Sequence, residues 1–134
     1  MQQIQHLIDA ESVAATSGRT SPVFDPATGE QRAELGLASV DDVDRAVASA
    51  KAAYEDGRHV SIARRTKMMF EFRNLVVKNA DEIAARLTAE HGKVLSDAGG
   101  EVARAIENIE FACGLSEHLK GSHSEQASTG VDVY

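Results

Sequence analysis

Cys113 is the only cysteine in the chain and the only conventional thiol nucleophile available to it. A cysteine attacks carbonyl carbon when a neighbouring His or a helix N-terminus lowers its pKa. Cys113 instead falls on the apolar stripe of a predicted helix, away from the start of that helix and with no His beside it. Because free cysteine is among the most buried residue types, we predict that Cys113 is a core residue and not a nucleophile.

Arg104 lies in the segment Gly100-Glu101-Val102-Ala103-Arg104. Its guanidinium carries a planar fork of donors that suits a carboxylate, so one interpretation is a substrate-binding site. The alternative is a set of surface ion pairs, since Glu101 and Glu107 stand three residues away on either side. Composition and spacing alone favour the surface ion pairs, which are common on exposed helices.

The remaining polar residues form no recognisable catalytic or metal-binding motif. The five histidines lack the spacing of a zinc site and the Cys partners that would complete one: His6, His59, His91, His118 and His123. Gly92-Lys93 resembles a phosphate-binding loop only superficially, because Leu87 and Val94 replace its glycine and hydroxyl residues.

Composition and charge exclude several classes of protein. Hydrophobic residues make up 43% and charged residues 26% of the 134, which predicts a folded domain and not a disordered one. The net charge of −7 argues against nucleic acid or an anionic membrane as partner. No apolar run is long enough to span a bilayer, and the N-terminus lacks the features of a signal peptide. We therefore predict a cytoplasmic protein with neither of these partners.

The first 38 residues predict short strands joined by turns. Residues 4–8 and 20–24 favour extended structure, and Asp25-Pro26 with Thr28-Gly29 indicates a turn. Ala33, Leu35 and Leu37 then alternate with polar or small residues, as in a half-buried strand. A hairpin around the sequence PATG is expected.

From Ser39 onward the apolar spacing predicts four helices. The first begins at Ser39 with a capping box to Asp42 and ends at Gly57. The second covers 61–78, the third begins at an Asn79 cap and ends at Gly92, and the fourth runs from near Ser96 toward Leu119. Each helix is expected to bury one stripe of side chains: Val40, Val43, Val47, Ala50 and Tyr54; Met68, Met69, Phe72, Leu75 and Val76; Ile83, Ala84 and Leu87; Val102, Ile106, Ile109 and Cys113.

The composition changes after Gly121. We predict a domain of strands and helices over 1–121, then a polar linker within 122–134 and the start of a strand at Val131. The predicted fold class is therefore mainly α with a short N-terminal β-hairpin.

Three stretches together resemble the N-terminal part of the aldehyde dehydrogenase superfamily: FDPATGE at 24–30, AELGLASVDDVDRAVASAKAAY at 33–54 and EHGKVLSDAGGEVARAIENIEFACG at 90–114. Within that superfamily, KMMFEFRNLVVKNADEIA, GEVARAIENIEFACG and STGVDVY are most similar to the CoA-acylating methylmalonate-semialdehyde dehydrogenases. The resemblance covers nearly the whole chain but only the opening portion of the family's longer sequence. It implies the truncated N-terminal portion of an α/β, Rossmann-like fold, with helices that flank the nucleotide-binding sheet and a final strand in the oligomerisation sheet.

The resemblance implies an activity for the full-length family. Its members oxidise methylmalonate or malonate semialdehyde through a thioester on a catalytic cysteine, transfer hydride to NAD, release carbon dioxide and pass the acyl group to CoA. The regions that carry the nucleophile and the nucleotide-binding loops lie beyond the part matched here. We therefore expect no bound NAD or CoA and no turnover from this chain alone.

The resemblance also implies two kinds of site. The arginine of the GEVxR motif, which is thought to help hold the substrate carboxylate, matches Arg104. A structural monovalent cation, bound by backbone carbonyls before the PATGE turn and by the acid before the GK pair, would involve Val23, Phe24 and Glu90.

Two functional hypotheses follow. The first is an N-terminal fragment of such a dehydrogenase that is inactive by itself. The second is a non-enzymatic helical module that associates with itself, as a homo-oligomer, or with an intact dehydrogenase subunit.

Overall fold

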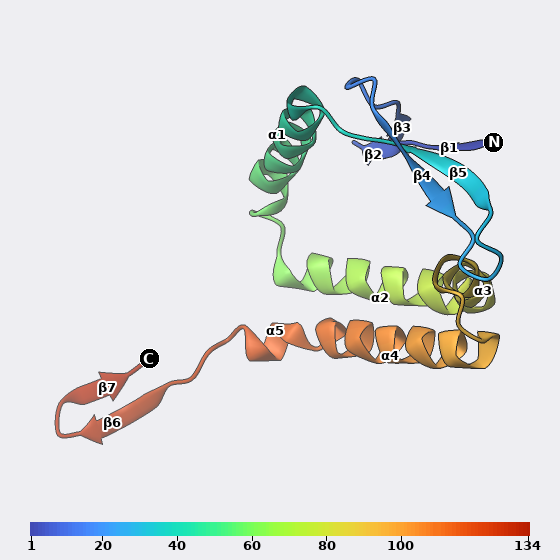
Figure 1. The fold of residues 1–134 in the computed structure, drawn as a ribbon. Helices are drawn as coiled ribbons and strands as arrows, with labels where there is room; N and C mark the ends of the chain where they lie inside the picture. The colour runs from blue at the N-terminus through green and yellow to red at the C-terminus, as the bar shows by residue number, and fades with distance from the viewer.

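The computed structural model describes residues 1–134 and is mainly α-helical, with short strands at both ends (Figure 1). This confirms the predicted fold class. The strands are β1 (Gln2–Ile4), β2 (His6–Ile8), β3 (Glu11–Val13), β4 (Thr20–Phe24), β5 (Gln31–Gly36), β6 (Ser124–Ser128) and β7 (Val131–Val133). The helices are α1 (Val40–Gly57), α2 (Ile62–Lys78), α3 (Ala80–His91), α4 (Leu95–Cys113) and α5 (Leu115–His118). None of the helices combines the length and the apolar character that crossing a membrane requires.

The N-terminal strands form two small sheets. One has the order β1-β5-β4, in which β1 is parallel and β4 antiparallel to β5, and the other is the β2–β3 hairpin. The predicted hairpin around PATG is confirmed as the β4–β5 pair. The extended structure expected at 4–8 is present, but it is divided at Gln5 between β1 and β2, which belong to different sheets.

Helix α1 begins as its sequence predicts. Ser39 Oγ accepts a hydrogen bond from the Asp42 N–H (3.1 Å), and Asp42 Oδ2 accepts one from the Ser39 N–H (2.9 Å). This reciprocal pair is a capping box, which satisfies two backbone donors at the helix start. The predicted cap at Asn79 is not formed. Its side-chain amide donates back to the Leu75 carbonyl (2.7 Å), because α2 and α3 follow each other almost without a break.

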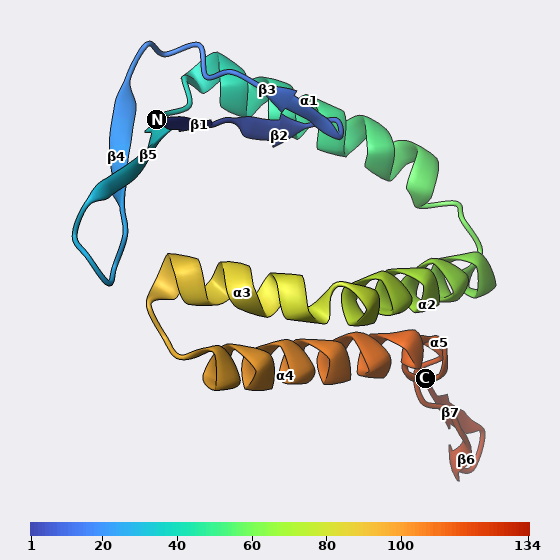
Figure 2. The same ribbon diagram turned by 90° about the vertical axis from the view of Figure 1, so that its right-hand side faces the viewer.

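Helices α2, α3 and α4 form one layer. Helix α4 lies antiparallel along α2 and α3, which follow one another end to end (Figure 2). Its small core is built from Ala84, Ala98 and Val102, with Ala80, Leu87 and Ile106 packed around them. Arg73 of α2 and Glu110 of α4 add an ion pair of 2.6 Å across the layer. The predicted inner stripe of the fourth helix is confirmed, since Val102 and Cys113 are buried and Ile106 and Ile109 are half-buried.

Two predicted apolar stripes are not buried as expected. On α1, Val40, Val43, Val47 and Tyr54 are all more than half exposed, and on α2 the same holds for Met68 and Leu75, with Phe72 half exposed. The physical reason is that α1 packs against β2 and makes no substantial contact with α2, α3 or α4. Only Met69 and Val76 of the second stripe turn toward the layer.

The C-terminal segment also differs from expectation. The fourth helix does not continue to Leu119, because the chain breaks at Gly114 and forms the separate helix α5. The stretch expected as a polar linker contains β6, which pairs with β7 through a turn at Gly130. This hairpin projects away from the helices (Figure 1). The strand predicted to start at Val131 is confirmed as β7.

Candidate functional site

Helix α4 separates its two chemically notable residues onto opposite faces. Cys113 lies on the inner face with Val102 and is 6% exposed, so the prediction of a buried core cysteine is confirmed. Arg104 follows Val102 by two residues, which is about 200° around an α-helix. It therefore lies on the outer face, away from α2 and α3, and it is exposed.

The guanidinium of Arg104 has no carboxylate partner within the chain. Glu101 pairs instead with Lys93, and Glu107 takes part in none of the eight ion pairs. The hydrogen bond from Lys93 is the main cause that lowers the pKa of Glu101, to which the nearby charge of Arg104 adds a smaller effect. The surface ion pairs that the spacing favoured are thus not formed. Arg104 is left free to bind an anion from outside the chain.

The residues of the expected cation site come from two elements that meet. Val23 and Phe24 end β4, and Glu90 lies in the last turn of α3. Gly92, which has φ +83°, follows α3, and a Cβ placed on it would lie 3.1 Å from Pro26. The end of α3 therefore packs closely on the β4–β5 turn. The Glu90 carboxylate forms an ion pair with Arg32 of β5 across this contact.

No three His, Cys, Asp or Glu side chains gather closely enough to bind a metal ion together. Nor does the chain supply a glycine-rich loop that would hold the phosphates of a dinucleotide.

Asp42 is a buried carboxylate with more hydrogen-bond partners than its sequence pattern predicts. It is 3% exposed, and its Oδ2 accepts hydrogen bonds from the backbone N–H groups of Ser39 and Thr16, both at 2.9 Å. Arg45 lies 3.4 Å from its Oδ1. The capping-box pattern reveals the Ser39 contact, but no local signal reveals Thr16, which is 26 residues away. Asp42 therefore joins the segment between β3 and β4 to the start of α1.

These hydrogen bonds predict how stability depends on pH. The backbone donors of Ser39, and after them those of Thr16, hold the pKa of Asp42 well below its ordinary value of 3.8. Folding thus favours the ionised form, so this stabilisation is complete above about pH 4 and is lost as pH falls through the folded pKa. We expect the thermal unfolding temperature of the unaltered protein to decrease when the pH is lowered below about 4. At pH 7, Asp42→Asn should have a lower unfolding temperature than the unaltered protein. Thermal melts from pH 7 to pH 2.5 measure both.

Asp42→Asn removes the titrating group, so its midpoint should decline less than that of the unaltered protein between pH 4 and pH 2.5. Asp41→Asn, on the exposed neighbouring residue, is the matched control and should leave the decline unchanged. Parallel declines in the unaltered protein and Asp42→Asn would show that other carboxyl groups control the acid transition.

Comparison with known proteins relates this geometry to one family. The sequence model of the aldehyde dehydrogenase family matches residues 13–134. The chain is 37% identical to a malonate-semialdehyde dehydrogenase of Pseudomonas aeruginosa over 100% of its own length and 27% of that protein. It is 40% identical to malonate-semialdehyde dehydrogenase 3 of Geobacillus kaustophilus, over 96% of this chain and 27% of that protein.

Solved structures of the same family also superpose on this chain. A methylmalonate-semialdehyde dehydrogenase of Oceanimonas doudoroffii superposes with a TM-score of 0.88 at 42% identity, covering 98% of this chain and 27% of that one. A Sinorhizobium meliloti structure, assigned as a methylmalonate-semialdehyde dehydrogenase and complexed with NAD, gives 0.88 at 40% identity with the same coverage. The chain thus spans about a quarter of the length of the relatives it matches, and over that span it belongs to the aldehyde dehydrogenase family.

Proposed function

We propose that this chain forms the N-terminal part of an NAD-dependent, CoA-acylating dehydrogenase of methylmalonate or malonate semialdehyde, as in valine and inositol catabolism. The supporting observation is the superposition on the Oceanimonas doudoroffii methylmalonate-semialdehyde dehydrogenase over 98% of this chain. We place the protein in the cytoplasm, where a single cysteine kept as a buried thiol is expected.

In this proposal the chain contributes substrate recognition and not bond chemistry. Arg104 presents an unpaired guanidinium from a rigid helix of 19 residues. A bidentate contact to the carboxylate of the semialdehyde would orient the substrate and distinguish it from an uncharged aldehyde. The thiolate, NAD and CoA are supplied and held by the remainder of the dehydrogenase.

We further propose that the contact between α3 and the β4–β5 turn holds a monovalent cation. The backbone carbonyls of Val23 and Phe24 and the carboxylate of Glu90 are hard oxygen ligands, which suit sodium or potassium better than zinc. Arg32 competes for Glu90 in this structure. Cation binding therefore requires that Glu90 leave Arg32 or share its second oxygen.

The expected result for the purified chain is that it produces no NADH from malonate semialdehyde, NAD and CoA. The physical reason is that Cys113 is buried on the inner face of α4 and that no nucleotide-binding loop is present. Absorbance of NADH is the measurement, and Cys113→Ser is the control for trace contamination. CoA-dependent NADH production that Cys113→Ser abolishes would overturn this assignment of inactivity.

The second candidate is a non-enzymatic module that associates with itself as a homo-oligomer or with an intact dehydrogenase subunit. The exposed apolar residues of α1 and α2 favour it, since such patches mark interaction surfaces. Light scattering of the purified chain, alone and with an intact dehydrogenase, distinguishes these two associations.

A further inference from the structure

Lys93 is the most enclosed basic side chain among the eight ion pairs. Only 16% of it is exposed, whereas the other basic partners are between 31% and 79% exposed. It lies in the segment 92–94 between α3 and α4, and its ammonium group pairs with the Glu101 carboxylate in the second turn of α4. An enclosed side chain has already lost most of its rotamer freedom, so Lys93 holds Glu101 at little further entropic cost.

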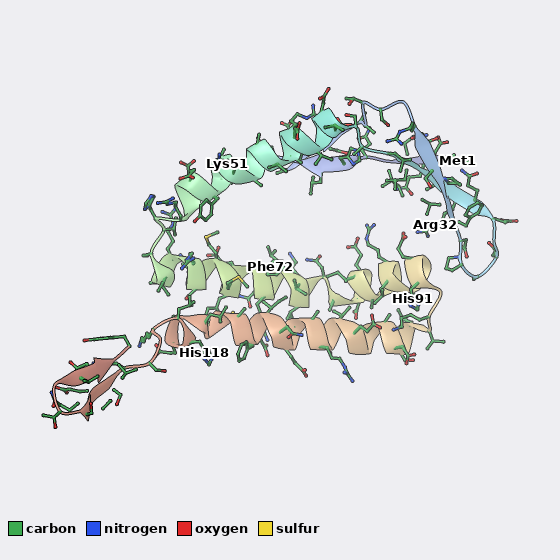
Figure 3. The ribbon with its side chains drawn as sticks, turned by 60° about the vertical axis from the view of Figure 1, so that its left-hand side comes forward. Met1, Arg32, Lys51, Phe72, His91 and His118 are labelled. Carbon is green, nitrogen blue, oxygen red and sulfur yellow. The ribbon has the colours of Figure 1, made fainter.

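The backbone on both sides of Lys93 is fixed by contacts of its own. Gly92 ends α3 with φ +83°, where a Cβ would lie 3.1 Å from Pro26. After Lys93, the Val94 carbonyl accepts the hydrogen bond that opens α4 (3.2 Å). Figure 3 shows His91 at this turn between the two helices. Lys93 is thus held against the start of α4.

Glu101 is the carboxylate best placed to compete for Arg104. Residues three apart on a helix are neighbours, and a pair is stronger when the acid precedes the base. Glu101 precedes Arg104 by three residues, whereas Glu107 follows it by three. The hydrogen bond from Lys93 is the largest cause that lowers the pKa of Glu101, and the charge of Arg104 adds a smaller effect. With Lys93 absent, Arg104 becomes the nearest partner for Glu101.

A pair between Glu101 and Arg104 would oppose substrate binding in two ways. A guanidinium that holds one carboxylate has fewer donors left for a bidentate contact to a second. The charge of Glu101 would also repel the carboxylate of the semialdehyde. Lys93 removes both effects at once, because its ammonium group holds Glu101 and compensates its charge.

We propose that Lys93 is a positioning residue for the recognition of aldehydes that carry a carboxylate. By holding Glu101, it keeps the guanidinium of Arg104 available to the substrate, and it does not touch the substrate itself. This proposal rests on the proposed function of Arg104. Three residues of alternating charge then determine the substrate preference of the dehydrogenase: Lys93, Glu101 and Arg104.

Two simpler roles of Lys93 fit the structure less well. As a second substrate-binding cation, it would have to leave Glu101 and move out of an enclosed position. As a brace of the turn between α3 and α4, it would be redundant, because Gly92 and Val94 fix that backbone through their own contacts. Each role predicts a different response to the removal of Glu101.

Steady-state kinetics of the Pseudomonas aeruginosa malonate-semialdehyde dehydrogenase, with this chain in place of its matched N-terminal quarter, test the proposal. Lys93→Met removes the charge and keeps the length of the side chain. We expect it to raise KM for malonate semialdehyde about 10-fold with little change in kcat, because only substrate binding is weakened. Kinetics with propanal, which has no carboxylate, should stay unchanged. Lys67→Met breaks a similar pair with Glu71 on α2 and, as the matched control, should leave both substrates unaffected.

Further variants separate positioning from the other two roles. Lys93→Met combined with Glu101→Gln should restore KM to within about twofold, because the competitor for Arg104 is gone. In an Arg104→Leu background, Lys93→Met should have no further effect, since it acts through Arg104. Lys93→Arg should keep the pair with Glu101 and the low KM. A KM that stays raised in the double variant, or a further loss in the Arg104→Leu background, would overturn the proposal.

NMR spectroscopy of the purified chain gives a readout that does not depend on activity. Exchange of the Arg104 Nε–H proton with water should slow about threefold in Lys93→Met, as Glu101 pairs with Arg104, and recover when Glu101→Gln is added. Equal exchange in all three proteins would contradict the proposal. If Arg104→Leu leaves the kinetics with malonate semialdehyde unchanged, the proposed function of Arg104 fails and the positioning role fails with it. An effect of Arg104→Leu without one of Lys93→Met contradicts the positioning role alone.

Discussion

Val102→Asp is expected to unfold the layer formed by α2, α3 and α4. Val102 is 5% exposed and forms the core of this layer with Ala84 and Ala98. An aspartate there buries a charge without a partner, which costs several kcal/mol. A small domain has only about 5–15 kcal/mol of stability in total, and this chain buries few residues. We therefore expect loss of helical circular dichroism at 25 °C.

Ala103→Asp is the matched control for this prediction. It introduces the same side chain one residue further along α4, at a position exposed to solvent. We expect its urea midpoint to stay close to that of the unaltered protein, because surface substitutions usually change stability by less than about 0.5 kcal/mol. Equal midpoints for both variants would show that the Ala84–Ala98–Val102 cluster does not stabilise the layer.

Local signals in the sequence were sufficient for the four long helices and for some of their ends. The Ser39–Asp42 pair specifies a cap through side chains only three residues apart, and Gly92 supplies the positive φ that ends α3. The inner stripe of α4 was likewise correct, because its partners α2 and α3 belong to this chain. Interactions contained within one helix, or between neighbouring helices, are the ones that a residue pattern encodes directly.

The stripes of α1 and α2 show where such a pattern misleads. Val43, Val47 and Phe72 recur with helical spacing, and that spacing records that one face is apolar. It contains no information about which element covers the face. In this chain β2 lies against only part of the α1 stripe, so residues that were predicted to form a core remain half exposed or more.

Long-range contacts were the other part that sequence could not supply. The parallel pairing of β1 with β5, the Asp42–Thr16 hydrogen bond and the Arg32–Glu90 ion pair each join segments at least 26 residues apart. For the candidate site, the nearby glutamates favoured surface ion pairs for Arg104. In the structure Glu101 forms its ion pair with Lys93, which lies in the segment between α3 and α4.

The second large effect is expected at Arg104, measured in the Pseudomonas aeruginosa malonate-semialdehyde dehydrogenase with this chain in place of its matched N-terminal quarter. Arg104→Leu should lower kcat/KM for malonate semialdehyde by about 100-fold, because a charge-assisted hydrogen bond contributes about 1.5–3 kcal/mol. Propanal has no carboxylate, so its kcat/KM should stay unchanged. Initial rates of NADH formation with both substrates measure the difference.

Two further variants identify the reason for that loss. Arg104→Lys keeps the positive charge but not the planar fork, so it should recover part of the activity toward malonate semialdehyde and fall short of arginine. Glu107→Gln changes the charge of a neighbour three residues along the same helix and should affect both substrates little. If Arg104→Leu slowed propanal and malonate semialdehyde equally, the role of Arg104 would be structural. If the effect is confined to the carboxylate substrate, the outer face of α4 recognises the negative charge of the substrate. The inner face of α4, which includes Cys113, then serves to pack the helix against the layer.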